Sequence, residues 1–130
     1  MASRLRPCDN AITEGRLSKA KQFREAAVVL RDVSDDETEV GDAFVTLCVH
    51  AGIAASDVLC CRALGHHVQG DTHHEAIAEL RKVDKDLARD LQTLVGMKTR
   101  AGYSDTAVTA NQRKRACRAA DRLVTAAATR

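Results

Sequence analysis

Lys98 occupies a position where a helix normally buries an apolar side chain. The helix expected over residues 86–101 places Leu91 and Leu94 on its apolar face, and Lys98 continues that face by one turn. An ammonium group there must extend to the end of the helix or meet an acidic or phosphate partner. We therefore treat Lys98 as a candidate anion-binding residue. It belongs to the segment MKTRAGY, residues 97–103, which also supplies a second cation and a phenol.

Histidines cluster around a turn in the middle of the chain, in the segment GHHVQGDTHHEA, residues 65–76. The histidines are His66, His67, His73 and His74. Cys60 and Cys61 lie shortly upstream. A structural zinc site needs converging ligands, whereas adjacent His–His or Cys–Cys pairs point in divergent directions. We therefore expect no metal here and interpret the histidines as turn residues, with His73 and His74 kept as candidate binding residues.

The stretch VTLCVHAGIAASDVLCCRAL, residues 45–64, is apolar or small almost all the way round a helix, which indicates a helix inside a bundle. One polar stripe follows this helix. Its members, Asp42, Thr46, His50 and Asp57, fall within about 80° of arc around the helix axis. Such a stripe normally faces solvent or forms hydrogen bonds across the bundle. The alternative is a functional groove lined by His50 and Asp57.

The cysteines are odd in number and lack the spacing of a disulfide framework. They are Cys8, Cys48, Cys60, Cys61 and Cys117. We interpret all except Cys8 as small core residues, and Cys60 with Cys61 as the only pair that suggests redox chemistry. The N-terminal segment has no apolar run, and His50 and Asp57 interrupt the longest apolar run. These features predict a cytoplasmic protein without a signal peptide or a membrane span.

Charge is distributed unevenly, although the net charge is only +2. Residues 32–42 contain acids and no base, whereas residues 113–130 contain a single acid, Asp121, among many bases. Those bases are Arg113, Lys114, Arg115, Arg118, Arg122 and Arg130. A charged helix face is usually just solvated, and the alternative is a basic strip that faces phosphate.

Helical periodicity and capping residues divide the chain into helices without any strand pattern. The first expected helix runs from a cap at Asp9 or Asn10 to near Ser34, and the second from about residues 39–43 to Leu64, before a stop at Gly65. The third runs from a cap at Asp71 or Thr72 through Val83. The last two cover residues 86–101 and about residues 107–128. We predict an all-α fold, an antiparallel bundle of four long helices plus one short helix. It forms one domain over residues 1–130, with its core at about 9–128.

Three segments together resemble a bacterial branch of the HEPN (higher eukaryotes and prokaryotes nucleotide-binding) family. They are the central helix at residues 45–64, the turn GDTHHEA at residues 70–76 and MKTRAGY at residues 97–103, and they match in order and spacing. The resemblance covers about residues 11–127. It implies a HEPN-like bundle, pairing of two bundles in a homodimer, and a role near RNA or nucleotide.

Nuclease members of this family, as the resemblance implies, carry an arginine followed a few residues later by a histidine at the end of the fourth helix. The arginine neutralises the phosphate, and the histidine transfers a proton during attack of the ribose 2′-hydroxyl, without a metal. Here Lys98, Arg100 and Tyr103 occupy that place, and no histidine follows His74. A phenol, with an ordinary pKa near about 10, is a poor proton shuttle at neutral pH. The nuclease motif is therefore degenerate.

The function predicted from the sequence is a HEPN-like binding or regulatory module of a bacterial defence, toxin–antitoxin or nucleotide-linked system. The expected binding residues are Lys98, Arg100, Tyr103, His73, His74, His50 and Asp57, and the first three are the catalytic candidates if catalysis remains. We expect a homodimer, an RNA, nucleotide or cognate protein partner, no membrane association and no cofactor.

Two other functions stay open. The first is a metal-independent endoribonuclease that uses Lys98, Arg100 and Tyr103 with a histidine brought close by the fold or by a second chain. A displaced site at Arg62 and His67, which have the family's spacing in the wrong helix, belongs to the same class. The second is a helical structural or adaptor protein with no nucleic-acid role.

Overall fold

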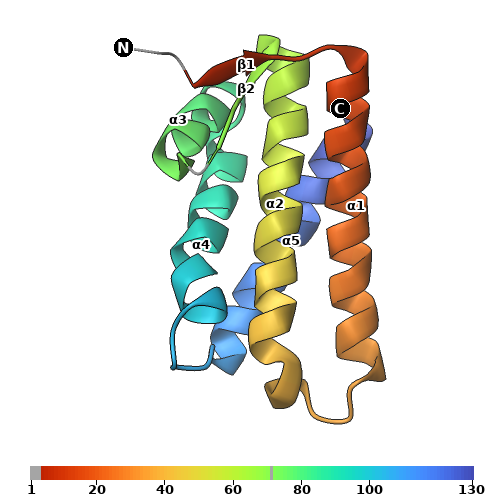
Figure 1. The fold of residues 1–130 in the computed structure, drawn as a ribbon, viewed down its shortest axis with the longest axis vertical. Coiled ribbons are helices and arrows are strands. Elements are labelled where there is room, and N and C mark those ends of the chain that lie inside the picture. The colour runs from red at the N-terminus through yellow and green to blue at the C-terminus, as the bar shows by residue number, and fades with distance from the viewer. Residues whose placement is uncertain (1–3, 71) are drawn as a thin grey trace.

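The computed structural model describes residues 4–70 and 72–130. In chain order its elements are β1 (Leu5–Pro7), α1 (Asn10–Val33), the 3₁₀ helix η1 (Glu37–Val40), α2 (Gly41–Leu64), β2 (His66–Val68), α3 (His73–Val83), α4 (Lys85–Gly102) and α5 (Ala110–Thr129). The long helices run along one another, with α3 beside the upper part of α4 (Figure 1). The predicted all-helical bundle class is confirmed.

Helix ends follow the local signals of the sequence. The carboxylate of Asp9 accepts a hydrogen bond from the Ile12 amide at 2.8 Å and starts α1, which ends before Ser34. Gly65 adopts a φ of 78° after α2, and its amide donates to the Cys61 carbonyl. Only glycine takes this left-handed conformation without strain, so the predicted stop at Gly65 is confirmed.

The ends of the last three helices differ slightly from the prediction. Thr72 is the N-cap residue of α3 but its side chain makes no capping bond, and Asp71 lies outside the described residues. Asp84 caps α4 by accepting from the amides of Asp86 and Leu87. α5 begins at Ala110, three residues later than predicted, because Thr109 and Gln112 form a reciprocal capping box there.

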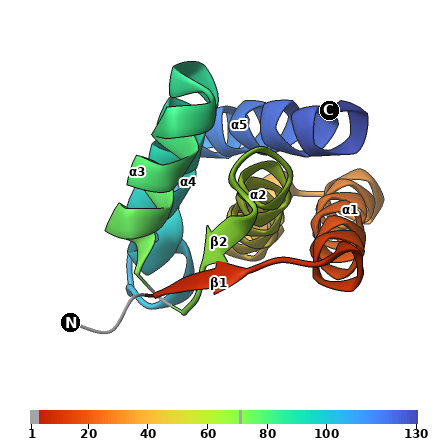
Figure 2. The ribbon, with the colours of Figure 1, turned by 90° about the horizontal axis from the view of Figure 1, so that it is seen from above.

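The predicted absence of strands is wrong at one end of the bundle. β1 and β2 pair as an antiparallel ladder in which Leu5 faces Val68 and Pro7 faces His66. Figure 2 shows this ladder lying across the end of the bundle next to α2. Strands of three residues are too short to carry a periodic pattern, so the ladder depends on tertiary contacts rather than on local sequence.

The central position of α2 gives the bundle its core. Seen from above, α2 lies between α1, α4 and α5 (Figure 2). A Cβ atom placed on Gly52 would lie 2.3 Å from Leu94 Cδ1, so α2 and α4 approach closely at this glycine. The continuous stretch Glu37–Leu64 has the length and composition of a membrane-crossing helix, and 78% of its most apolar window is buried in the bundle.

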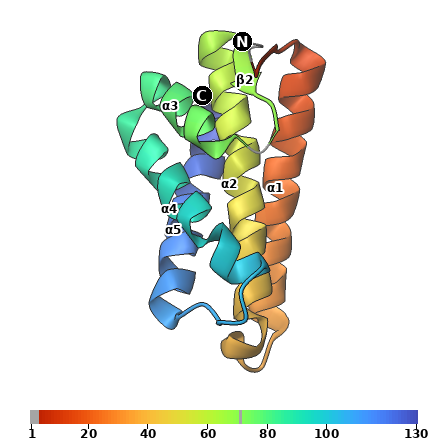
Figure 3. The same cartoon turned by 60° about the vertical axis from the view of Figure 1, so that its left-hand side comes forward.

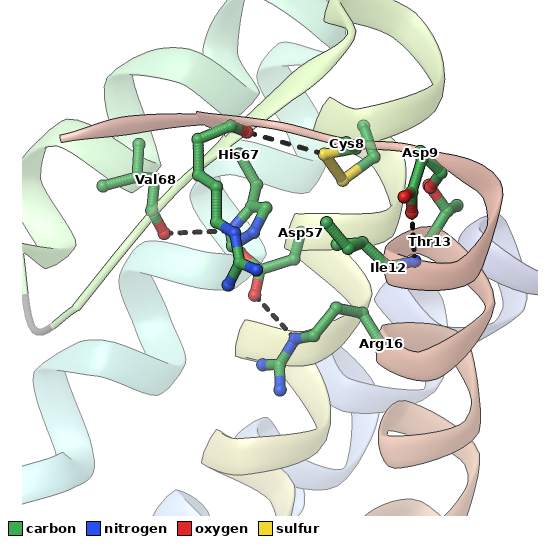
Figure 4. The surroundings of a disulfide bond; sticks show 10 residues. Cys8, Asp9, Ile12, Thr13, Arg16, Asp57, His67 and Val68 are labelled. Carbon is green, nitrogen blue, oxygen red and sulfur yellow. Dashed lines mark hydrogen bonds and ion pairs between the residues drawn. A yellow bond between two sulfur atoms is a disulfide. The ribbon is translucent and has the colours of Figure 1, made fainter. Parts of the chain in front are cut away.

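A disulfide bond joins Cys8, just after β1, to Cys61 near the end of α2 (Figure 4). Cys61 is buried, as predicted for a small core residue, but its bond to Cys8 was not expected. The two residues are 53 positions apart and show no framework spacing, and only the folding of the β1 segment over the end of α2 brings them together. The cytoplasmic location inferred partly from unpaired cysteines remains a prediction.

Candidate functional site

Lys98 and His73 meet between two neighbouring helices. α3 and α4 form a hairpin on one side of the bundle (Figure 3), and Lys98 Nζ on α4 lies 3.2 Å from His73 Nε2 in the first turn of α3. An ammonium can only donate, so this contact requires an unprotonated Nε2 and a neutral His73 ring. Lys98 is partly buried, as its place on the apolar face of α4 predicts.

Arg100 and Tyr103 follow Lys98 but face other surroundings. Arg100 Nε donates to the Ala107 carbonyl at 3.0 Å and so holds the loop between α4 and α5. Tyr103 is 79% exposed just beyond the end of α4. The structure therefore brings Lys98 next to a histidine, while among the described residues no hydrogen bond or ion pair links Arg100 or Tyr103 to that pair.

His74 and His50 are both exposed, at different places. His74 lies in the first turn of α3 next to His73, whereas the His50 ring stacks at a tilt against Phe23 of α1, with 5.3 Å between ring centroids. No contact joins His50 to Asp57 in the described part of the chain. Their roles in binding remain predictions.

Asp57 belongs to a buried charge network at the ladder end of the bundle (Figure 4). Its Oδ2 accepts from Arg16 Nε of α1 at 2.9 Å, and its Oδ1 lies 3.5 Å from His67 Nδ1 of β2. Asp57 is only 7% exposed. Burial raises the pKa of Asp57, and the charges of Arg16 and His67 oppose that rise. These partners give Asp57 a structural role that fastens α1 and β2 to α2.

The rest of the polar stripe on α2 is also used within the fold. Asp42 Oδ1 accepts from the Val108 amide at 2.9 Å, which anchors the loop before α5. The Thr46 hydroxyl donates to the Asp42 carbonyl. Asp42 and Asp57 thus form hydrogen bonds to other segments, Thr46 bonds within α2, and His50 is exposed.

The remaining turn histidines take separate partners. His66 Nε2 lies 2.6 Å from Glu79 Oε1, and Glu79 also pairs with Lys82. Arg62 donates to the carbonyls of Ala127 and Arg130, so it does not converge with His67. Within residues 4–70 and 72–130, no group of three or more histidine, cysteine or acidic side chains is arranged to hold a metal ion.

The free thiols are Cys48, Cys60 and Cys117, within the described residues. Burial raises the pKa of Cys48 and of Cys60 to about 12, so both thiols are protonated at neutral pH. A protonated thiol is a poor nucleophile, and Cys60 is therefore not poised to attack the neighbouring disulfide.

The basic segment of α5 divides into two parts. Arg122 makes a two-armed ion pair with Asp90, at 2.8 and 2.6 Å, and Arg130 pairs with Asp84 at 2.9 Å. These bonds tie α5 to α4. The first part of the segment lines a pocket of about 460 Å³ between α1, α2 and α5. The sequence signalled the bases of α5, but not the residues from α1 and α2 that complete this pocket.

In comparisons with protein-family models, with curated protein sequences and with solved structures, no significant match was found.

Proposed function

We propose that this chain is a HEPN-like binding or regulatory module that recognises the phosphate of RNA or a nucleotide, without efficient catalysis. The contact between Lys98 and His73 carries the proposal. It supports a site at the α3–α4 hairpin because a cation and an imidazole there can both turn toward one phosphate group. The module would act as a cytoplasmic homodimer in a bacterial defence, toxin–antitoxin or nucleotide-linked system.

The charge of Lys98 is the feature that a phosphate ligand would use. In the free protein its ammonium nitrogen lies 3.2 Å from His73 Nε2. A bound phosphate oxygen offers a stronger, charge-assisted bond, and a protonated His73 can then donate to the same anion. Tyr103 and Arg100, further along the same end of α4, are the candidates for contacts to neighbouring nucleotides.

The test measures the affinity for a short fluorescently labelled single-stranded RNA by anisotropy, with unlabelled adenosine monophosphate as competitor. Lys98→Met should weaken binding by about tenfold, because one charge-assisted bond is lost. Lys85→Met is the matched control, since it removes the same charge from an exposed position at the other end of α4. Equal losses in the two variants, or no binding by the natural chain, would favour the adaptor function instead.

The same contact gives a second candidate function specific support. His73 supplies a histidine beside a cation, which the segment after Arg100 lacks, so α3 would provide the proton-transferring group of a metal-independent endoribonuclease. In this case the natural protein cleaves RNA in the presence of EDTA. His73→Gln should then reduce the cleavage rate at least about a hundredfold while RNA affinity changes little. Absence of cleavage leaves the binding module as the function.

A further inference from the structure

We propose that the pocket between α1, α2 and α5 is a binding site for a small phosphorylated ligand with a flat apolar body. This site goes beyond the proposed function, because none of its lining residues belongs to the α3–α4 hairpin. Its volume of about 460 Å³ falls in the range of small-molecule sites, roughly 300–1,000 Å³.

Positive charge dominates the walls of the pocket. Arg31 comes from α1, and the other bases, Arg113, Lys114 and Arg118, come from the first turns of α5, while Glu37 is the one acid among the lining residues. The side chains of these three α5 bases make no hydrogen bond or ion pair with the described residues, in contrast to Arg122 and Arg130. A concave surface with unneutralised charge of one sign concentrates an oppositely charged ligand.

Arg31 is held in place before any ligand arrives. Its Nε lies 3.3 Å from Asp32 Oδ1, its Nη1 lies 3.5 Å from Cys117 Sγ, and its guanidinium lies over the Phe44 ring at 5.9 Å from the centroid. Burial raises the pKa of the Cys117 thiol, so the Cys117 contact adds no negative charge, and the exposed Asp32 is the acid that pairs with Arg31. A positioned cation costs less conformational entropy on binding.

Arg113 lies across a glycine at the start of α2. A Cβ atom on Gly41 would lie 3.1 Å from Arg113 Cδ, so the glycine makes room for the stem of this arginine. Hydrogen bonds from the Thr38 hydroxyl and amide, and to a lesser extent the charge of Arg113, lower the pKa of the exposed Asp36. Within the described residues no hydrogen bond or ion pair engages the Arg113 guanidinium, so it remains available to an incoming anion.

The uncharged lining residues of the pocket indicate the second half of the ligand. They are Val40, Phe44, Ala110 and Cys117, and all of them are apolar or small. An aromatic ring or other flat apolar group can pack against these residues while its phosphate pairs with the lining cations. The combination fits a phosphate ester of an apolar or aromatic body better than free inorganic phosphate.

The experiment uses phenyl phosphate as the probe and follows the amide signals of α5 and α2 by NMR, with calorimetry for the affinity. We expect saturable binding at about 1 mM or tighter at low salt, with shifts of the pocket residues that are separate from any at the α3–α4 hairpin. Inorganic phosphate should bind at least about tenfold more weakly. Adenosine monophosphate distinguishes the source: tighter binding than phenyl phosphate identifies a nucleotide, and weaker binding identifies a smaller aryl or alkyl phosphate.

The decisive variant is Arg113→Gln combined with Arg118→Gln, which keeps polar side chains of similar length and should weaken binding of phenyl phosphate at least about tenfold. Arg115→Gln is the matched control, because Arg115 is exposed on the same helix and does not line the pocket. It should change the affinity less than about twofold. The same titrations are repeated in the Lys98→Met background, so that phosphate bound at the α3–α4 hairpin does not contribute to the affinity assigned to the pocket.

Several results would overturn the assignment. They are no saturation up to about 10 mM phenyl phosphate, equal affinity for inorganic phosphate, equal losses in the double variant and in Arg115→Gln, or shifts at the pocket with RNA but not with phenyl phosphate.

Discussion

At the scale of single residues, Asp57 shows how one position can look functional and serve the fold. It lies on the same polar stripe of α2 as His50, yet its carboxylate is buried between Arg16 and His67, whereas His50 is exposed. Buried charge is tolerated when its partners come from neighbouring elements, and here they come from α1 and β2.

Replacing Asp57 therefore has a predictable cost. Asp57→Ala should lower the free energy of unfolding by about 2 kcal/mol, because it removes the acceptor of the half-buried Arg16 guanidinium and the acidic neighbour of the buried His67 ring. Asp57→Asn should cost less, since it keeps an acceptor oxygen for Arg16 and removes a charge whose burial is unfavourable. Urea denaturation measures both values. His50→Ala is the control on the same stripe and should cost below about 1 kcal/mol; a larger loss there would contradict the structural assignment.

Lys98 and His73 show the opposite case. The sequence identifies Lys98 as a charged residue on an apolar helix face, but the separation of Lys98 and His73 along the chain does not indicate that they meet. The histidine expected after Arg100 is absent from the sequence. A histidine 25 positions upstream occupies the neighbourhood of the lysine instead, through the α3–α4 hairpin.

At the scale of elements, the contact of α2 with α4 depends on Gly52. Gly52→Ala should lower stability by about 1–3 kcal/mol, because the new methyl group would overlap the buried Leu94 side chain. Gly96→Ala is the matched control, because a Cβ atom there meets nothing within 4 Å, and this variant should be neutral or slightly stabilising.

A double-mutant cycle tests whether the overlap is the cause. Combining Gly52→Ala with Leu94→Ala should destabilise the protein by clearly less than the sum of the single variants, since the shortened side chain makes space for the methyl group. Additive losses would mean that Gly52 acts through the backbone alone.

The contact of Glu79 on α3 with His66 of β2 predicts that the stability of the fold depends on pH. The hydrogen bonds from Lys82 and His66 lower the pKa of Glu79 below its ordinary 4.5. The unfolded chain then takes up a proton on Glu79 at a higher pH than the folded chain does. The stabilisation by Glu79 is therefore complete above about pH 4.5 and is lost as the pH falls through its folded pKa.

Glu79→Gln tests this sign. The natural protein should be more stable than the variant at pH 6, and the difference should shrink as the pH falls below about 4.5 in chemical denaturation at each pH. The control is Glu75→Gln, an exposed position on the same helix, whose difference from the natural protein should stay small throughout. A difference that grows toward acid would reverse the assigned role of Glu79.

At the scale of the whole molecule, the Cys8–Cys61 disulfide ties the N-terminal segment to the central helix across 53 positions. Its loss raises the conformational entropy of the unfolded chain. Reduction, or the Cys8→Ser variant, should lower the free energy of unfolding by about 2–4 kcal/mol, measured by urea denaturation with and without reductant. Unchanged stability on reduction would show that the bond adds nothing to the packing of β1 on β2.

Thiol labelling of the folded protein is the companion measurement. The disulfide should leave Cys8 and Cys61 unlabelled until reduction, whereas Cys48 and Cys60 should resist labelling in both conditions because burial raises the pKa of each thiol to about 12.

The sequence by itself determined the helices and most of their ends, because these depend on neighbouring residues. Asp9 and Gly65 act within one turn of the helices that they start and stop, and the apolar character of α2 requires burial in any compact fold. It also identified Lys98 as a charged residue on an apolar face.

Only the tertiary structure decided which distant groups meet. It joined Cys8 to Cys61, gave Asp57 its partners Arg16 and His67, and placed Arg31 of α1 beside the bases of α5. It also built the β1–β2 ladder, whose strands are too short to show a pattern. These contacts bridge separations of many residues, and they form because helix packing brings the surfaces together, a property that local spacing does not encode.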